Sequence, residues 1–303
     1  MQKTPSGREA LRDQAEGRRE PPGSVAIIGL GLIGGSLARD LARCGVRVLA
    51  HDIDEATLHA AVAAGAVHDI LHDDFVGVEK ADVVVIAVTV DRAPGILEVL
   101  ASRDGPAVTD VGSTKASIMR VAEELGMGDR FLGSHPLAGD HRGGWSSSRE
   151  GLFHGATVYI CAPSPTRSVR ISSRTTDALQ RVQDLWHAVG ARPEHLDAHT
   201  HDQRLAWSSH LPQVVSTVLA LTLRTVGVRA AELGSGGRDV TRLAGSAAEV
   251  WTPICLDNAT NLTAALQAVE QQLASLREAL EARDDGAVHD VFAAAHEWAA
   301  ARE

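Results

Sequence analysis

The sequence predicts an α/β domain built on a doubly wound parallel sheet, followed by an all-helical domain. Short β-branched runs alternate with helical segments from Val25 to about residue 198. A glycine-rich turn follows the first of these runs. After residue 199 no further β-rich run occurs, and apolar residues recur at helical spacing. We therefore expect the two domains at residues 25–198 and 199–303.

The polar segment ahead of the first strand, residues 1–24, is predicted to be a disordered tail. It contains acidic residues and ends in Pro21-Pro22-Gly23-Ser24, so it lacks the apolar core of a secretory signal. No run of the chain approaches the ~18 apolar residues that a membrane helix needs. We therefore expect a cytoplasmic protein with no membrane partner.

Net charge and cysteine usage narrow the function classes further. The formal net charge is -10 with no block of Lys and Arg, which disfavours nucleic acid and anionic membranes as partners. The three cysteines, Cys44, Cys161 and Cys255, lack C-x-x-C spacing. They predict neither a disulfide framework nor a zinc site, and we expect buried free thiols and no metal.

The elements of the α/β domain follow in a regular order. Strands are expected at residues 25–29, 47–51, 81–88, 106–112, 131–136, 158–163 and 191–198, and helices at 33–44, 54–65, 93–102, 114–126 and 175–190. Such alternation predicts a parallel sheet covered on both faces. In the second domain, helices are expected at 201–226, 254–284 and 287–303, with a glycine-rich elbow at 232–242.

The glycine-rich turn is a G-x-G-x-x-G motif between a strand and a helix. A second strand then ends in Asp52, 18 residues beyond the last glycine, as in Rossmann dinucleotide-binding units. Asp52 would bind the adenosine ribose and repel a 2′-phosphate, which favours NAD over NADP. Alternatively Asp52 only caps the next helix, although Asp54 fits that cap better. The expected cofactor-binding residues are Gly29, Gly31, Leu32, Ile33, Gly34 and Asp52.

Four further motifs carry polar residues suited to chemistry. TDVGSTK (109–115) and GSHPLAG (133–139) follow the ends of two strands, where open α/β sheets bind ligands. SSHLPQ (208–213) and GSGGRDVTR (234–242) lie in the helical part. The residue before a proline is kept out of the helical region, so His135 could present its ring to a ligand or could simply lie in a turn.

Taken together and in this order, the five motifs resemble those of the prephenate and arogenate dehydrogenases of tyrosine biosynthesis. That family carries a GLGLIGGS-type loop, D-x-G-S-x-K, G-x-H-P-M-A-G, S-H-L-P-H and R-D-T-T-R, and the match runs from Val25 to at least Asn258. Two departures are Leu137 in place of a methionine and Gln213 in place of a histidine.

The resemblance implies an NAD-dependent oxidative decarboxylation of prephenate, a cyclohexadienyl substrate, to 4-hydroxyphenylpyruvate. By this resemblance His135 accepts the hydrogen of the ring hydroxyl, and Ser113 orients that hydroxyl or the histidine. Arg242 would bind a substrate carboxylate, with His210 near the substrate and Gln213 at a recognition position. Family members form homodimers through the helical domain, so we expect a homodimer with the site between its domains.

Other activities remain open on the sequence alone. Arogenate carries an amino group where prephenate has a keto oxygen, and 4-amino-4-deoxyprephenate replaces the ring hydroxyl. The neutral amide of Gln213 could suit either keto or amino side chain, or could merely pack the helical turn after Pro212. A β-hydroxyacid dehydrogenase would need a lysine in the second domain, but no lysine follows Lys115. An inactive NAD-binding regulator would be expected to have lost His135 or Ser113, and both are present.

Overall fold

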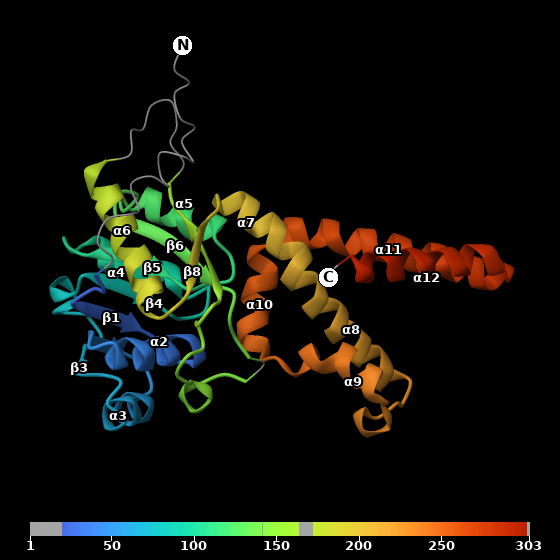
Figure 1. Ribbon diagram of the computed structural model, residues 1–303, viewed down its shortest axis with the longest axis horizontal. Helices are drawn as coiled ribbons and strands as arrows, with labels where there is room; N and C mark the ends of the chain where they lie inside the picture. The colour runs from blue at the N-terminus through green and yellow to red at the C-terminus, as the bar shows by residue number, and fades with distance from the viewer. Residues whose placement is uncertain (1–19, 141, 164–171, 302–303) are drawn as a thin grey trace, which may run out of the picture.

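The computed structural model describes residues 20–140, 142–163 and 172–301 (Figure 1). Most of the predicted tail, residues 1–19, lies outside these ranges, and Ser24 already belongs to the first strand. A sheet covered by helices forms one half of the molecule, and helices alone form the other half. In the described part of the chain, no helix combines the length and apolar character needed to cross a membrane.

The sheet has eight strands in the order β3-β2-β1-β4-β5-β6-β7-β8. The strands are β1 (Ser24–Ile28), β2 (Arg47–His51), β3 (Asp69–Ile70), β4 (Val83–Ile86), β5 (Ala107–Asp110), β6 (Phe131–Pro136), β7 (Thr157–Cys161) and β8 (Arg192–His195). Each strand begins or ends within a few residues of its predicted position, except β3, whose two residues are too few to leave a periodic pattern. The predicted α/β sheet is thus confirmed.

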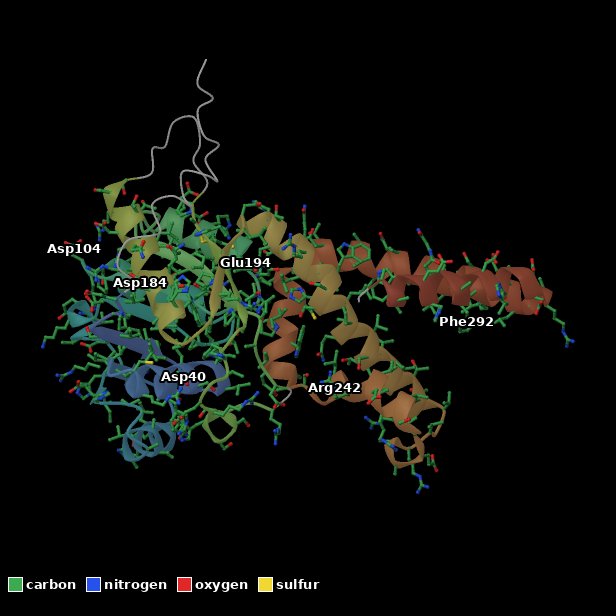
Figure 2. The ribbon with its side chains drawn as sticks, viewed as in Figure 1. Asp40, Asp104, Asp184, Glu194, Arg242 and Phe292 are labelled. Atoms are coloured by element: carbon green, nitrogen blue, oxygen red, sulfur yellow. The ribbon has the colours of Figure 1, made fainter. Side chains whose placement is uncertain are left out.

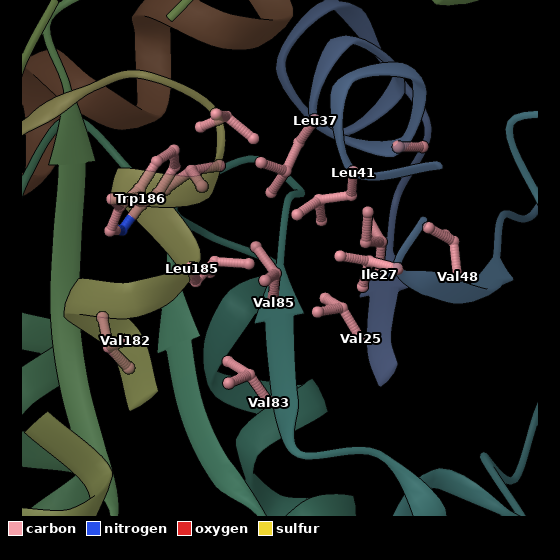
Figure 3. Close-up of a cluster of buried hydrophobic side chains, with 14 of the residues drawn as sticks. Val25, Ile27, Leu37, Leu41, Val48, Val83, Val85, Val182, Leu185 and Trp186 are labelled. Carbon is pink, nitrogen blue, oxygen red and sulfur yellow. The ribbon is translucent and has the colours of Figure 1, made fainter. Parts of the chain in front are cut away.

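Helices cover both faces of the sheet, as the alternation predicts. They are α2 (Leu32–Arg43), α3 (Glu55–Ala63), α4 (Ala93–Ala101), α5 (Ala116–Glu124) and α6 (Ser173–Ala188). Successive residues of a strand point to opposite faces, so β1 divides its side chains between two cores. Val25 and Ile27 pack with α2 and α6, whereas Ala26 and Ile28 pack with α4 and α5. Figure 3 shows the first core, in which Trp186 is fully buried.

One strand corrects the expectation of a wholly parallel sheet. β7 runs antiparallel to β6, with Gly133 opposite Cys161 and His135 opposite Tyr159. A parallel neighbour requires a crossover connection, usually a helix, on one face of the sheet. Between β6 and β7 the described chain instead forms a loop with one short turn, at Trp145–Ser147. This reversal places the Tyr159 ring beside the end of β6.

The helical half begins directly after β8. Its helices are α7 (Ala198–Leu205), α8 (Leu211–Thr225), α9 (Ser235–Thr241), α10 (Ala248–Asp257), α11 (Ala259–Ala282) and α12 (Asp285–Ala300). The helical half also has the short 3-10 turns η5 (Ala230–Glu232) and η6 (Arg242–Gly245), and the sheet half has η2 (Val78–Lys80) and η3 (Trp145–Ser147). In Figure 1, α11 and α12 lie side by side as an arm that extends away from the sheet.

Two predicted helices are divided, and the predicted elbow is partly helical. A π-helical turn, η4 (Ala206–His210), separates α7 from α8, and Pro212 lies in the first turn of α8. Asn258 separates α10 from α11. Within the expected glycine-rich elbow, α9 forms despite Gly236 and Gly237.

Replacing Trp186 by alanine should destabilise the sheet domain by about 3–5 kcal/mol, because it opens a cavity in a packed core. The indole also donates a hydrogen bond to Ser134 Oγ at 3.1 Å and contacts the Phe153 ring edge to face. Urea unfolding followed by circular dichroism measures the change. Val76→Ala, at an exposed site, is the control and should shift stability by no more than about 0.5 kcal/mol. Equal shifts for the two variants would contradict this assignment of the core.

Candidate active site

The glycine turn between β1 and α2 is shaped for close approach of a ligand. Gly29 has φ +100°, and a Cβ there would lie 2.5 Å from the Ala87 carbonyl oxygen. A Cβ on Gly34 would lie 2.0 Å from the Gly29 carbonyl oxygen, so Gly34 is required for packing of α2 against the turn. A Cβ on Gly31 would meet no atom within 4 Å, because this position faces open space. These contacts fit the cradle of a dinucleotide pyrophosphate at a helix N-terminus.

Asp52 lies directly after β2 and is tied to the same turn. Its Oδ2 accepts a hydrogen bond from Leu30 N at 2.6 Å, and its Oδ1 accepts one from Asp54 N at 2.9 Å. Asp54, not Asp52, caps α3 by accepting a hydrogen bond from Ala56 N. The alternative that Asp52 only caps a helix is therefore wrong, and its carboxylate borders the cavity described next.

A cavity of about 1290 Å³ joins the glycine turn to the helical half. From the α/β side it is lined by Gly29, Gly31, Leu32, Ile33, Asp52, Ser113 and His135. From the helical side it is lined by the η4 turn and by the start of α10, including Ser209, Ser246 and Trp251. Its volume exceeds that of a typical drug-sized pocket, so a dinucleotide and a small substrate can share it. Seven of the eleven predicted site residues thus meet at one cavity.

The ring of His135 is buried at the end of β6, and one of its nitrogens contacts a second histidine. His135 Nδ1 lies 2.9 Å from His201 Nε2 on α7, and His201 Nδ1 lies 2.8 Å from Asp202 Oδ1. The Asp202 carboxylate also accepts hydrogen bonds from Lys115 N and Ala116 N, both at 2.8 Å, where α5 begins. The loop with Ser113 and the ring of His135 are therefore anchored to the same carboxylate.

Burial keeps these histidines uncharged. Removal from water lowers the pKa of His135 well below its usual value, and the nearby His201, Lys115 and His210 lower it further. Burial also lowers the pKa of His201, against the opposing effect of its hydrogen bond to Asp202. Burial raises the pKa of Asp202, but the hydrogen bonds from His201 and the α5 backbone outweigh it and leave the pKa below its usual value. At neutral pH the group comprises two neutral imidazoles and one carboxylate.

The D-x-G-S-x-K motif contains a buried ion pair and a half-buried serine that borders the cavity. Lys115 is fully buried, and its Nζ forms an ion pair with Asp110 Oδ2. A Cβ on Gly133 would lie 2.9 Å from Lys115 Cδ, and one on Gly112 would lie 2.9 Å from Asp110 Oδ2, so both glycines make room for this pair. Ser113 borders the cavity instead. Within the motif, Ser113 is thus the side chain placed to meet a ligand.

His210 occupies the last position of the π-helical turn and is fully buried. Its Nδ1 lies 3.1 Å from Asn258 Nδ2, which also donates to the Asp202 backbone carbonyl at 2.8 Å. Burial lowers the pKa of His210 to about 4, so the ring is neutral. Because the Asn258 NH2 can only donate, Nδ1 accepts and Nε2 carries the proton. The ring packs edge to face on Trp251. His210 thus supports the cavity wall, and its side chain does not line the cavity in this chain.

Gln213 and Arg242 also lie outside the cavity lining. Gln213 is buried, its amide donates to the Leu243 carbonyl oxygen at 2.7 Å, and its Oε1 accepts from Ser246 Oγ at 3.4 Å. This geometry favours the alternative in which residue 213 packs the helical turn, one layer behind the cavity-lining Ser246. Arg242 begins η6 and is exposed to solvent (Figure 2). Within the described residues, no carboxylate forms an ion pair with it.

Several expectations about other residues can now be assessed. Cys161 is buried, and burial raises its pKa to about 12, but Cys255 is half-buried and Cys44 is exposed, so the prediction of buried thiols holds for one of the three. Among the described residues, no three His, Cys, Asp or Glu side chains are placed to hold a metal ion. Sequence reasoning missed the roles of His201, Asp202 and Lys115. Lys115 is part of the D-x-G-S-x-K motif, but His201 and Asp202 lie outside every motif, and no local pattern joins His201 to His135, 66 positions away.

Comparison with known proteins assigns both halves of the chain. Residues 37–195 match the family model described as prephenate dehydrogenase, nucleotide-binding domain. Residues 197–294 match the model described as prephenate dehydrogenase, dimerization domain. The chain belongs to the prephenate dehydrogenase family. The resemblance seen in the five motifs is thereby confirmed.

Individual members of the prephenate dehydrogenase family show the same likeness. The chain is 30% identical to a prephenate dehydrogenase of Bacillus subtilis, over 78% of this chain and 64% of that protein. It is 31% identical to a cyclohexadienyl dehydrogenase of Zymomonas mobilis, over 86% of this chain and 89% of that protein. The crystal structure of prephenate dehydrogenase from A. aeolicus, in complex with hydroxyphenyl propionate and NAD+, superposes with a TM-score of 0.81. That alignment has 27% identity and covers 92% of this chain and 98% of the other.

The position of Asp52 permits a test of the predicted preference for NAD over NADP. Asp52→Asn removes the charge that would repel a 2′-phosphate, so the ratio of kcat/KM for NADP to that for NAD should rise by roughly tenfold or more. The KM for NAD should also rise, because an amide cannot accept from both Leu30 N and Asp54 N. Asp54→Asn, which changes the neighbouring cap, is the control and should leave the ratio unchanged. A wild-type protein that already uses both cofactors equally would contradict the prediction.

Proposed function

We propose that this protein is an NAD-dependent dehydrogenase that oxidises prephenate to 4-hydroxyphenylpyruvate and CO2. The observation that carries the proposal is the neutral His135 ring at a cavity shared by the glycine turn and Ser113. Membership of the prephenate dehydrogenase family and the NAD+ in the A. aeolicus complex support it. The proposal includes a cytoplasmic location.

The reaction removes two electrons and one proton from the substrate ring carbon that bears the hydroxyl. Bound NAD supplies the acceptor for the hydride. The hydroxyl proton passes to the free ring nitrogen of His135 as the carbonyl forms, and Ser113 hydrogen-bonds the hydroxyl oxygen. The bond to the ring carboxylate then breaks, its electrons enter the ring, and CO2 leaves. The ring oxygen takes back a proton from His135 and becomes the phenol hydroxyl of the product. Aromatisation of the ring makes this last step favourable.

The cofactor is assigned to the cradle around α2. Gly29, Gly31, Leu32 and Ile33 line the cavity where the pyrophosphate would meet the helix N-terminus, and Asp52, which lines the same cavity, would bind the ribose. α2 has no side-chain cap and no acidic residue in its first turn, so nothing there competes with an anion. Gly34 acts through packing alone. The residues present therefore fit NAD.

Arg242 is assigned to a carboxylate of the substrate. Its exposed guanidinium has no ion-pair partner in the described chain and lies four residues before the cavity-lining Ser246. A guanidinium can bind a carboxylate through two parallel hydrogen bonds. In this proposal Gln213 fixes the η6 turn that carries Arg242, and His210 fixes the η4 turn.

A homodimer is part of the proposal. The second family model is described as a dimerization domain, and exposed apolar side chains recur on α8, α11 and α12. They include Leu221, Leu273, Leu280 and Phe292, the last labelled in Figure 2. Exposed apolar side chains that gather on neighbouring helices are typical of a surface that another protein covers. A second copy of this chain would cover it.

Arogenate is the second candidate substrate. The Zymomonas relative is named for the cyclohexadienyl ring, not for one side chain. The neutral Gln213 behind Ser246 adds no positive charge that would repel an ammonium group. Prephenate remains the first choice because both family models carry that name.

Initial rates with prephenate and arogenate, each with NAD and NADP, test the proposal directly. We expect prephenate with NAD to give the largest kcat/KM, and His135→Gln to lower kcat by roughly 10²–10⁴-fold. Because burial holds the pKa of His135 well below 6.5, this base is still neutral at pH 6.5. Activity should therefore be level through pH 6.5 and fall only at lower pH. No turnover of either substrate by the wild-type protein would overturn the proposal.

Arg242→Ala should raise the KM for prephenate by roughly 10- to 100-fold, the cost of one charge-assisted hydrogen bond. The KM of Arg242→Lys should lie between those of the wild type and Arg242→Ala, since an ammonium keeps the charge but cannot make two parallel hydrogen bonds. Arg238→Ala is the matched control, because Arg238 donates to the Leu233 carbonyl within the elbow. Should both alanine variants bind prephenate normally, Arg242 has no part in recognition.

A further inference from the structure

The His135 ring has two nitrogens, and the structure commits only one of them. Nδ1 is 2.9 Å from His201 Nε2, whereas no side chain of the described residues hydrogen-bonds Nε2. His135 borders the cavity, so Nε2 is the nitrogen left for a ligand. A ring nitrogen accepts a proton only if it does not already carry one. Which nitrogen of His135 is protonated therefore decides whether the ring can act as a base.

The hydrogen-bond chain behind the ring settles the protonation of each nitrogen. The Asp202 carboxylate only accepts, so His201 Nδ1 must donate to it. A neutral His201 then has an unprotonated Nε2, which can only accept. His135 Nδ1 must therefore carry the proton that it donates to His201. A neutral His135 is left with an unprotonated Nε2 facing the cavity.

We propose that His201 and Asp202 are positioning residues that hold His135 in the tautomer whose Nε2 accepts the substrate proton. This inference rests on the role of His135 in the proposed function. As Nε2 gains the proton, positive charge spreads over the His135 ring and strengthens its bond to His201. The Asp202 charge stabilises that bond through the other ring nitrogen of His201. Neither residue touches the substrate.

Burial and hydrogen bonds fix the orientation of His201 and Asp202. The two residues are almost fully buried, where an unmatched polar group is costly. The two α5 amide groups hold the Asp202 oxygens in place, so its acceptor face cannot turn away from His201. The other charged or titratable groups near these hydrogen bonds include the Lys115–Asp110 ion pair, His210, the Cys161 thiol and Tyr159, whose ring edge meets His201 and whose hydroxyl accepts from Arg204. Because Lys115 is already paired with Asp110, Asp202 is the carboxylate left to orient His201.

The test compares variants that remove or retain the acceptor for His135 Nδ1. His201→Leu removes it, whereas His201→Gln can offer a carbonyl oxygen at a similar reach. Asp202→Asn leaves His201 in place but removes the charge that fixes its tautomer. His199→Leu is the matched control, since His199 is exposed on the same helix two residues away. Circular dichroism and NAD binding by fluorescence confirm that each variant is folded.

Two readouts separate this inference from the proposed function. The first is the ¹⁵N chemical shifts of histidine-labelled protein without substrate, with the His135 signals assigned by their loss in His135→Gln. We expect a protonated Nδ1 and an unprotonated Nε2 in the wild type, and a mixture of tautomers in His201→Leu and Asp202→Asn. The second is steady-state turnover of prephenate, which should fall roughly 10- to 100-fold in kcat with little change in KM. His201→Gln should recover part of the loss, and His199→Leu should match the wild type.

A wild-type spectrum with Nε2 protonated would overturn the inference, whatever the substrate proves to be. So would normal kcat in both His201→Leu and Asp202→Asn. If the wild type turns over neither prephenate nor arogenate, the proposed function fails, while the chemical shifts still report whether His201 sets the tautomer. If His201→Leu does not fold, Asp202→Asn and His201→Gln decide the outcome by the same two readouts.

Discussion

The buried carboxylate of Asp202 is the interaction on which the arrangement of this cavity depends. A charge removed from water must find hydrogen bonds, and this one finds them in two different parts of the chain. It accepts from the two amides at the start of α5 and from the ring of the preceding residue, His201. The backbone carbonyl of the same residue accepts from Asn258, where α10 gives way to α11. The sheet domain, the first helix of the second domain and the long arm thus converge on one residue.

Glycines at two places let neighbouring segments around the cavity approach closely. Gly29 and Gly34 bring α2 against the end of β4, and Gly112 and Gly133 leave space for the long buried side chain of Lys115. With Lys115 neutralised by Asp110, the α5 terminus can point its amides at a second carboxylate. Gly31 differs, since no atom of the described chain fills the space beside it. The sequence cannot distinguish a glycine that makes room for protein from one that makes room for a ligand.

Features set by local chemistry could be predicted from the sequence, whereas those set by distant contacts could not. The first strand, the glycine turn and the Asp54 cap depend on neighbouring residues, and each was found where expected. The direction of β7 depends on whether a helix crosses between β6 and β7, and strand-like composition is the same either way. His201 and Asp202 are adjacent, and the composition of their helix does not show that they face the end of β6. Gln213 was placed in recognition by resemblance alone, yet its amide is engaged by the Leu243 carbonyl.

The junction between the sheet and the helical half has a consequence for hybrid proteins that combine the two halves from different family members. In the proposed mechanism, the ring that meets the substrate is His135 on β6, and the groups that determine where its proton lies, His201 and Asp202, belong to α7. A hybrid gene that joins one member's sheet to another member's helices at residues 196–197 would therefore inherit its acid–base chemistry from both parents. Such a fusion retains that chemistry only if the histidine and aspartate that open the second half meet a compatible α5 terminus in the first. In the proposed mechanism, both halves of the chain thus contribute to a single proton acceptor.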